Sequence, residues 1–195
     1  CFQPYFNGTE LPCQARFLME NVFYDGIIVQ TNWHASMFKK MYPDTSDRLN
    51  VIGNGIDTSN FMTTLEKVPY RFIYTSSPKR GLSYLLKIFP KIREKWPTSE
   101  LHIYRGPEEF TQEQNQAIES MSKYVFSEGM VENSLLVKEF LQSDVWLYPT
   151  EFSETYCISA LEAQAAGCLC ICSDLAALSE VVGNRGVLLK ESYGS

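Results

Sequence analysis

Short apolar runs alternate along this chain with longer segments of helical periodicity. The apolar runs leave no polar face, so they predict strands that are covered on both sides, as in parallel sheets with helical crossovers. The pattern indicates an α/β protein with a Rossmann-like parallel sheet and helices on both faces. The expected strands lie at residues 26–30, 49–52, 70–75, 100–104, 145–148, 168–172 and 187–189.

Helices are expected between these strands, at residues 83–96, 111–124, 135–142, 156–166 and 175–182. Thr111 and Ser134 are the predicted N-caps of the second and third helices. Pro90 should kink or shorten the first helix. Gly167 follows residues 156–166, at a place where a helix end favours positive φ.

Length and charge limit the function classes. The 195 residues suffice for one substantial domain and a piece of another, and no apolar run approaches the ~18 residues of a membrane span. The formal net charge is −6, with 17 basic and 23 acidic residues scattered along the chain, which argues against a nucleic-acid partner. The chain starts at Cys1 with neither an initiator methionine nor a secretory signal, so we expect a fragment of a longer chain. The sparse cysteines favour a cytoplasmic protein with reduced thiols.

The cysteines do not follow a disulfide or metal-binding spacing, so reduced thiols and no metal ligands are expected. Cys168, Cys170 and Cys172 alternate in a predicted strand and should all point to one buried face. The two histidines, His34 and His102, are interpreted as structural residues.

Glu154 and Glu162 lie eight positions apart, across a predicted junction between a loop and a helix. The residues around them are mostly small and apolar, and burying an unpaired carboxylate is costly. The loop at 148–155 follows the carboxyl end of a predicted strand, which is the ligand side of such sheets. These observations predict a site for a polar ligand at this junction.

Further motifs accompany this pair in a fixed order. The strand at 26–30 leads to Thr31, and the segment 50–61 reads Asn-Val-Ile-Gly-Asn-Gly-Ile-Asp-Thr-Ser-Asn-Phe. Segment 76–82 reads Ser-Ser-Pro-Lys-Arg-Gly-Leu, segment 101–107 reads Leu-His-Ile-Tyr-Arg-Gly-Pro, and Glu162 begins Glu-Ala-Gln-Ala-Ala-Gly. Over about residues 24–190 the chain resembles the retaining nucleotide-sugar glycosyltransferases of the GT-B fold, in their group 1 family.

The resemblance implies a role for each matched residue. Glu154 would be catalytic, contacting the donor sugar near the transferring carbon, and Glu162 would bind the ribose hydroxyls. Arg80, helped by Lys79, would neutralise the diphosphate. The remaining residues that would contact the nucleotide sugar are Ser76, Ser77, Gly106 and the helix-opening amides of Thr155, Tyr156 and Cys157. No cofactor is expected beyond a UDP-, GDP- or ADP-sugar as donor substrate, and no metal.

Two departures from the family pattern stand out. Many relatives carry Gly-Arg where this chain has Ser76 and Ser77, so one cation of the usual pair is missing. The usual Gly-Phe-Gly after the first motif glutamate is replaced by Thr155, Tyr156 and Cys157, which bears on donor preference.

The resemblance also implies a domain organisation. Residues 1–49 would be a remnant of the N-terminal acceptor domain, 50–61 the interdomain linker, and 62–195 a truncated C-terminal donor domain. The expected function is transfer of a sugar from a nucleotide sugar to an acceptor hydroxyl with retention, a hexosyltransferase reaction in glycan biosynthesis.

Partners follow from the same resemblance. They would be the donor, a glycan, lipid or protein acceptor, the missing N-terminal domain, and a peripheral membrane surface for the full protein. Two alternatives remain at this stage: a nucleotide-sugar 2-epimerase, and a catalytically degenerate domain that binds a nucleotide or a partner protein.

Overall fold

The computed structural model describes residues 25–190 and divides the chain into two compact units. The first unit is Cys1–Asn54 and the second is Gly55–Ser195.

The described part of the first unit is a small βαβ element. Strands β1 (Ile27–Val29) and β2 (Leu49–Val51) pair in parallel, and helix α2 (Asn32–Met41) connects them with the 3₁₀ turn Pro43–Thr45. Thr31 caps α2 by accepting a hydrogen bond from the amide of His34 at 3.1 Å. Both predicted strands are confirmed, and the buried residues between them and α2 form a small core.

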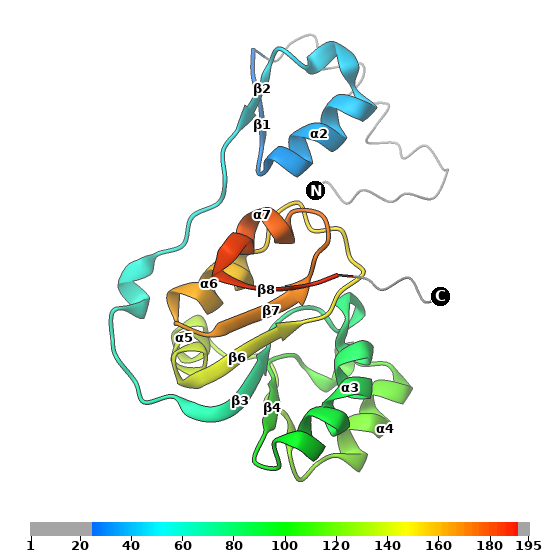
Figure 1. The fold of residues 1–195 in the computed structure, drawn as a ribbon, viewed down its shortest axis with the longest axis vertical. Coiled ribbons are helices and arrows are strands. Elements are labelled where there is room, and N and C mark those ends of the chain that lie inside the picture. Colours follow the sequence, from blue (N-terminus) through cyan, green and yellow to red (C-terminus); the bar gives the residue numbers. More distant parts are fainter. Residues whose placement is uncertain (1–24, 191–195) are drawn as a thin grey trace. The chain divides into compact units, whose positions relative to one another are not determined.

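The second unit contains a parallel sheet of six strands in the order β5-β4-β3-β6-β7-β8, which confirms the predicted fold class (Figure 1). β5 was not predicted; the other five strands of this sheet were. The strands are β3 (Val68–Tyr74), β4 (Glu100–Ile103), β5 (Val125–Ser127), β6 (Ser143–Tyr148), β7 (Leu169–Ser173) and β8 (Gly186–Leu189).

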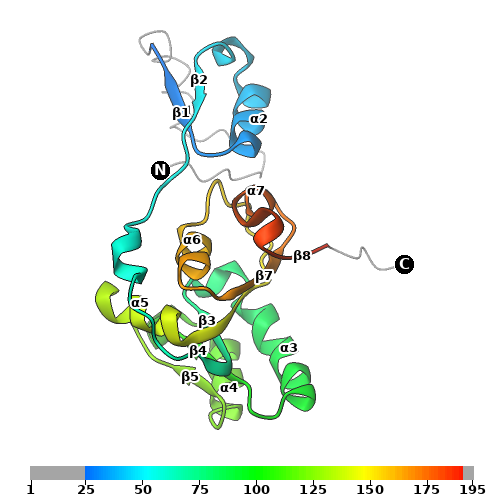
Figure 2. The same cartoon turned by 60° about the vertical axis from the view of Figure 1, so that its left-hand side comes forward.

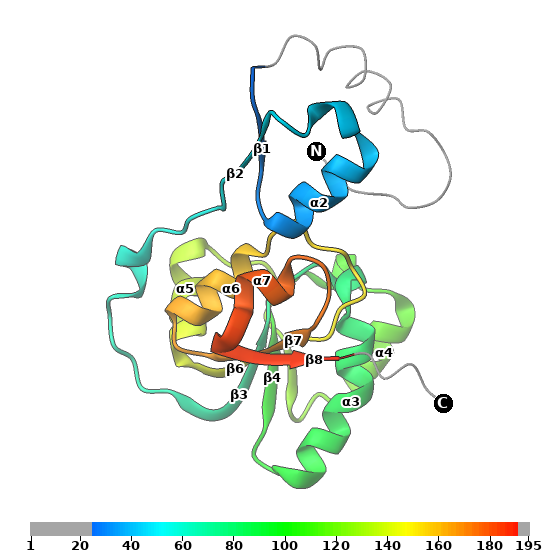
Figure 3. The same cartoon turned by 45° about the horizontal axis from the view of Figure 1, so that its top comes forward.

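Helices cover both faces of this sheet. Because the crossovers are right-handed, connections that lead toward one edge of the sheet place their helices on one face, and connections toward the other edge place theirs on the opposite face. Figure 2 shows α3 and α4 on one side with α5 and α6 on the other. In Figure 3, α6 and α7 lie together over β7. The helices are α3 (Leu82–Lys95), α4 (Gln112–Ser120), α5 (Asn133–Gln142), α6 (Ile158–Ala165) and α7 (Leu178–Val182).

Local sequence signals account for most helix ends. Thr111 forms the capping box of α4 with Gln114, and Gly167 has φ 72° after α6, as predicted. Ser134 does not cap α5, because that helix begins two residues earlier than predicted, at Asn133 with Glu132 as its N-cap. Pro90 lies inside α3 without ending it, since the apolar face of the helix is fixed by packing on the sheet.

The core of the second unit lies between the sheet and its two helix layers. Cys168, Cys170 and Cys172 are buried, whereas Leu169 between them is 48% exposed, which confirms that the three thiols share the inner face. Trp146 and Tyr148 on β6 are almost fully buried. Along β6 and β7 the sheet interior is therefore apolar up to its carboxyl edge.

The strand order reverses direction between β3 and β6, because β4 continues on one side and β7 on the other. The loops after β3 and β6 meet at this point. Gly81 has φ 116°, and a Cβ atom there would lie 1.9 Å from the carbonyl oxygen of Pro149. Only glycine fits, so the backbone of one loop rests directly on the other. A topological switch point of this kind is where open α/β sheets bind ligands.

Candidate active site

The centre of the candidate site is a triad of side chains at the carboxyl ends of β3 and β6. Glu154 accepts a hydrogen bond from the Tyr148 hydroxyl at 2.8 Å and pairs with Nη1 of Arg80 at 3.0 Å. Both bonds go to the same carboxylate oxygen, Oε1. No side-chain or backbone group of residues 25–190 donates to Oε2. The structure thus brings together two predicted site residues and a tyrosine that was not predicted.

Burial determines the electrostatics of this triad. Glu154 is only 8% exposed, and desolvation raises the pKa of its carboxyl group, although the bonds from Tyr148 and Arg80 act in the opposite direction. Burial, with the neighbouring Glu154 charge, also raises the pKa of Tyr148, so its hydroxyl stays protonated and donates. Glu154 is thus a buried anion held by one cation and one neutral donor.

Arg80 is positioned by the short 3₁₀ helix Pro78–Arg80, which begins two residues after the predicted phosphate-binding Ser76. Its guanidinium stacks on the ring of Phe152 at 4.0 Å, in the loop after β6. The Arg80 side chain remains 33% exposed. The Phe152 ring therefore holds one face of the guanidinium and Glu154 holds Nη1, while one edge of the group points toward solvent.

The other residues of this loop differ in exposure. Ser76 is buried, and Ser77 is half-buried, with a carbonyl oxygen that accepts from the Tyr74 hydroxyl at 2.9 Å. Lys79 is exposed, and within residues 25–190 its side chain forms no hydrogen bond or ion pair. Nothing in the structure brings Lys79 to Glu154.

The helix after the first glutamate begins later than expected. α6 starts at Ile158 with Cys157 as its N-cap, whereas residues 156–166 were predicted to be helical. Thr155 and Tyr156 therefore lie in the preceding loop and do not open the helix. The bulky, β-branched and aromatic residues at 155 and 156 favour extended backbone, which accounts for the later start. Cys157 is buried, and burial raises the pKa of its thiol to about 12.

Glu162 lies within α6 and differs sharply from Glu154. Its side chain is partly buried, and no ion pair or hydrogen bond to it occurs within residues 25–190. Desolvation alone raises the pKa of its carboxyl group. A half-buried carboxylate without a partner is destabilising in itself, which is a feature of sites that bind a ligand.

Gly106 follows β4 at the same carboxyl edge and has φ −71°, which any residue can adopt. A Cβ atom there would meet the Glu108 carboxylate at 1.9 Å, and that is a side-chain end that can move. Arg105, one residue earlier, donates from Nε to the carbonyl oxygen of Thr75 at 3.2 Å. The loop after β4 thus reaches the end of β3.

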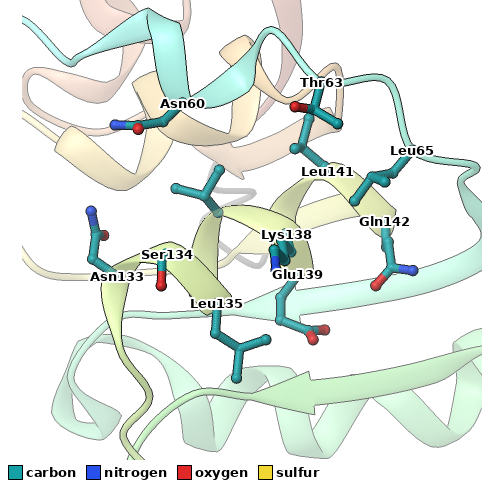
Figure 4. A pocket seen from close by; sticks show the side chains of 11 residues that line it. Asn60, Thr63, Leu65, Asn133, Ser134, Leu135, Lys138, Glu139, Leu141 and Gln142 are labelled. Carbon is teal, nitrogen blue, oxygen red and sulfur yellow. The ribbon is translucent and has the colours of Figure 1, made fainter.

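A cavity of about 520 Å³ lies elsewhere in the second unit, between α5 and residues 60–65 (Figure 4). None of the predicted site residues lines it. Its walls mix apolar side chains, such as Leu65 and Leu135, with polar ones such as Asn133 and Glu139. It does not share residues with the Arg80–Glu154 site.

Both histidines have structural partners, as interpreted from the sequence. His34 accepts at Nδ1 from the amide of Gln30 at 3.3 Å, and His102 lies 2.7 Å from Glu128. Within residues 25–190 there is no group of three or more His, Cys, Asp or Glu side chains placed to hold a metal ion. No helix in that range combines the length and apolar character needed to cross a bilayer.

Sequence reasoning missed Tyr148 and Phe152 as site residues. Tyr148 stands at the end of a core strand, where an aromatic residue is usually packing, and nothing in its neighbours marks its hydroxyl as a partner of Glu154. Phe152 lies in a polar loop and contacts Arg80. The two residues are 72 positions apart in the sequence, so only the tertiary structure brings them together. An aromatic residue inside an otherwise polar loop was the available signal.

The parallel sheet flanked by helices has the fold found in solved structures of GT-B glycosyltransferases. The chain belongs to the glycosyl transferases group 1 family, which matches residues 70–193. It is also 30% identical over 115 residues to a phosphatidyl-myo-inositol mannosyltransferase of Mycolicibacterium smegmatis, covering 57% of this chain and 29% of that protein.

Solved structures of low sequence identity share the fold. A TarM variant from S. aureus, crystallised in a complex that includes UDP, matches with a TM-score of 0.78 at 15% identity, over 98% of this chain and 39% of that one. The pneumococcal O-GlcNAc transferase GtfA, in complex with UDP and GlcNAc, matches with a TM-score of 0.73 at 19% identity, over 91% and 36%. The chain spans less than two thirds of each of these relatives.

Proposed function

We propose that this chain supplies the donor-binding half of a glycosyltransferase, which moves a sugar from a nucleoside-diphosphate sugar to an acceptor hydroxyl with retention of configuration. The family match supports the reaction class. The UDP in the complexes of GtfA and of the Anabaena protein HepE supports a nucleotide donor. The transferred sugar would be a hexose, and the reaction would take place in the cytoplasm.

One observation carries the proposal: Arg80 and Glu154, which are 74 positions apart in sequence, meet at the switch point of the sheet. A cation and a buried carboxylate at this edge match the two charged parts of the reaction. The diphosphate leaves as an anion, and the sugar carbon gains positive character when its bond to the phosphate oxygen breaks. Arg80 would neutralise the leaving group and Glu154 would stabilise the sugar.

The reaction exchanges one bond at the anomeric carbon for another. The bond to the phosphate oxygen breaks and its electron pair leaves with the nucleoside diphosphate. The acceptor oxygen bonds to the same face of the sugar, and its proton passes to the departing diphosphate. Ser76, Ser77, Lys79 and Gly106 would line the diphosphate beside Arg80. The amides of Thr155, Tyr156 and Cys157 would approach the donor from the loop and the N-cap of α6.

Glu162 would bind the ribose of the donor. Its carboxylate lacks a protein partner within residues 25–190 and can accept charge-assisted hydrogen bonds from vicinal hydroxyls. In this arrangement the donor provides the partner that the folded chain does not, so binding should offset the cost of desolvating Glu162.

Acceptor binding would fall to a partner lobe that includes residues 1–49, joined through the linker at 50–61 to the donor domain at 62–195. Closure of the two lobes would exclude water, which would otherwise hydrolyse the donor. The acceptor would be a glycan, a lipid or a protein, and a lipid acceptor would bring the full protein to a membrane surface.

Calorimetric titration with UDP, GDP and ADP tests this function. At least one diphosphate should bind, and Glu162→Ala should weaken it by about 1–3 kcal/mol through lost charged hydrogen bonds. Glu119→Ala, at an exposed glutamate of α4, is the matched control and should leave the affinity unchanged. Glu154→Ala should spare nucleotide affinity and abolish transfer in the full-length enzyme.

Two outcomes would contradict the proposal. If none of the three nucleotides binds at millimolar concentration, the chain is a degenerate domain. If the full-length protein releases an epimerised sugar in the absence of any acceptor, it is a 2-epimerase.

A further inference from the structure

The loop that follows β3 at its carboxyl end begins with two uncharged residues, Ser76 and Ser77, and Arg80 is its only arginine. We propose that Arg105, from the loop after β4, supplies a second guanidinium there and contacts the donor diphosphate together with Arg80. The inference rests on the proposed function and adds a residue that the sequence motifs did not assign.

Arg105 is anchored across the strand boundary. β4 pairs in parallel with β3, with Ile103 opposite Tyr74, so the residue two places after Ile103 emerges at the end of β3. There Nε of Arg105 donates to the carbonyl oxygen of Thr75 at 3.2 Å. The anchor is the carbonyl group of the residue directly before Ser76, so Arg105 is held where the loop after β3 begins.

Arg80 and Arg105 lie near the same end of β3. Burial raises the pKa of Tyr74, the last residue of β3, and the positive charges of both Arg105 and Arg80 act against this rise. Arg105 bonds to Thr75, and Arg80 belongs to the 3₁₀ helix that begins three residues after Thr75, so both arginines start from this end of β3. The hydroxyl of Tyr74 in turn donates to the carbonyl oxygen of Ser77, inside the loop that joins the two cationic positions.

The guanidinium of Arg105 keeps donors for a ligand. Its closest acidic group among residues 25–190 is Glu109, with Oε1 at 3.8 Å from Nη1, which is too long for a hydrogen bond. Nη1 otherwise lies 3.5 Å from the sulfur of Met130, a weak acceptor. The side chain is 30% exposed, close to the 33% of Arg80. An arginine fixed at Nε with a free edge can grip phosphate oxygens in bidentate fashion.

The end of β3 also has an unused polar group. The hydroxyl of Thr75 is buried and has no hydrogen-bond partner within the described residues. Buried polar atoms without a partner are uncommon, and each needs an explanation. Here the orphaned hydroxyl belongs to the same residue whose carbonyl holds Arg105, so the unsatisfied group and the available cation occupy one place.

Other arginines of this unit are engaged elsewhere. Arg71 is buried against Glu139, and Arg93 donates to the carbonyl of Ser99, just before β4 begins and so at the opposite edge of the sheet. Arg93 also stacks on Tyr124. This makes Arg93 a control for Arg105, because it is an anchored arginine far from the carboxyl ends.

The test compares wild type, Arg105→Gln, Arg105→Lys and Arg93→Gln in calorimetric titrations with UDP, in competition with inorganic pyrophosphate, and in NMR titrations with uridine. If GDP or ADP binds wild type more tightly, that nucleotide and its nucleoside replace UDP and uridine. Arg105→Gln should weaken the diphosphate about 10- to 100-fold, the loss of charge-assisted hydrogen bonds. The affinity of Arg105→Lys for the diphosphate should lie between those of wild type and Arg105→Gln. Arg93→Gln should bind the diphosphate as wild type does.

Uridine separates a contact with phosphate from a structural role. If Arg105 contacts the diphosphate, Arg105→Gln should bind uridine as wild type does. The same variant should bind inorganic pyrophosphate more weakly than wild type does. Equal loss for uridine and UDP would overturn the proposal, because Arg105 would then only support the loop. Equal UDP affinity in wild type and Arg105→Gln would also overturn it while leaving the donor-binding function intact. No binding of any diphosphate to wild type would overturn both.

Discussion

Two groups of charged side chains in the second unit differ in how completely they are paired. One, here called the buried network, joins Arg71, His102, Tyr104 and Glu139 on the face of the sheet below α5, with the exposed Glu128 at its margin. The Tyr104 hydroxyl donates to Glu139 at 2.5 Å, and Arg71 donates to the same carboxylate. The other group consists of Glu154, which is held through one oxygen only at the carboxyl ends of β3 and β6, and Glu162 on α6, whose carboxylate has no partner within residues 25–190.

The difference separates structure from function. Glu139 accepts hydrogen bonds from two donors, the Tyr104 hydroxyl and the Arg71 cation, so the cost of its burial is offset within the fold. Glu162 is partly buried without such compensation, and its pKa is raised for that reason alone. Folding gains nothing from an uncompensated carboxylate, which supports the proposed role of Glu162 in binding the ribose of the donor. The measurements below test this contrast.

The largest effect is expected when the buried network is broken. Glu139→Ala leaves the Arg71 guanidinium buried without its anion, which should reduce the free energy of unfolding by about 3–5 kcal/mol. Glu154→Ala should cost no more than about 1–2 kcal/mol, because Arg80 stays partly in solvent and mainly the Tyr148 hydroxyl loses a partner. Urea unfolding of both variants measures the difference, and equal losses would remove the distinction between the two groups.

The second test concerns how the site loops are held. Gly81→Ala places a Cβ atom against the carbonyl oxygen of Pro149 and strains a residue at φ 116°, so we expect a loss of about 3 kcal/mol or more in unfolding free energy. Gly129→Ala, at φ 75° with open space around it, carries only the backbone strain of about 1–2 kcal/mol. Should the two substitutions cost the same in urea, the contact between the loops is not what fixes them.

The smallest effect is a pH dependence at Glu162. Its pKa is higher in the folded state, so the folded chain binds this proton more tightly and loses stability as the pH rises above the unfolded value of about 4.3. Glu162→Gln carries no charge. It should match wild type below about pH 4 and be more stable at pH 7, by under about 1 kcal/mol because the side chain is partly exposed.

Thermal unfolding between pH 3.5 and pH 7.5 measures this difference, with Glu119→Gln as the exposed control. A saturating nucleotide that binds through Glu162 should reverse the order and favour wild type. If Glu162→Gln is less stable than wild type at pH 7 without nucleotide, the carboxylate has a structural role instead.

The sequence predicted the sheet well because its central strands are continuous apolar runs, and the alternating thiols at 168, 170 and 172 even indicated the inner face. It failed at β5, where Val125–Ser127 is a three-residue edge strand that follows directly on turns assigned to the preceding helix. Such a short segment has no periodicity of its own, and pairing with β4 decides its conformation.

The site was predictable where residues stand in a motif and unpredictable where they meet only in space. Arg80, Glu154 and Glu162 stand in motifs. Tyr148 looked like core packing, and the helix start at Ile158 was misplaced because alanine and leucine further on outweighed the extended preference of Thr155 and Tyr156. Arg105 stood in a matched segment, but its bond to Thr75 depends on the alignment of β3 with β4, which no local signal reveals.

The two bonds that end on Oε1 of Glu154 also fix where its other oxygen points. A carboxylate pinned at one atom by a ring hydroxyl and a guanidinium cannot rotate freely, so Oε2 keeps one orientation before any sugar arrives. For the proposed transfer this is preorganisation: the dipole that must meet the developing charge is aimed during folding, and no reorientation is left for the moment of bond breaking.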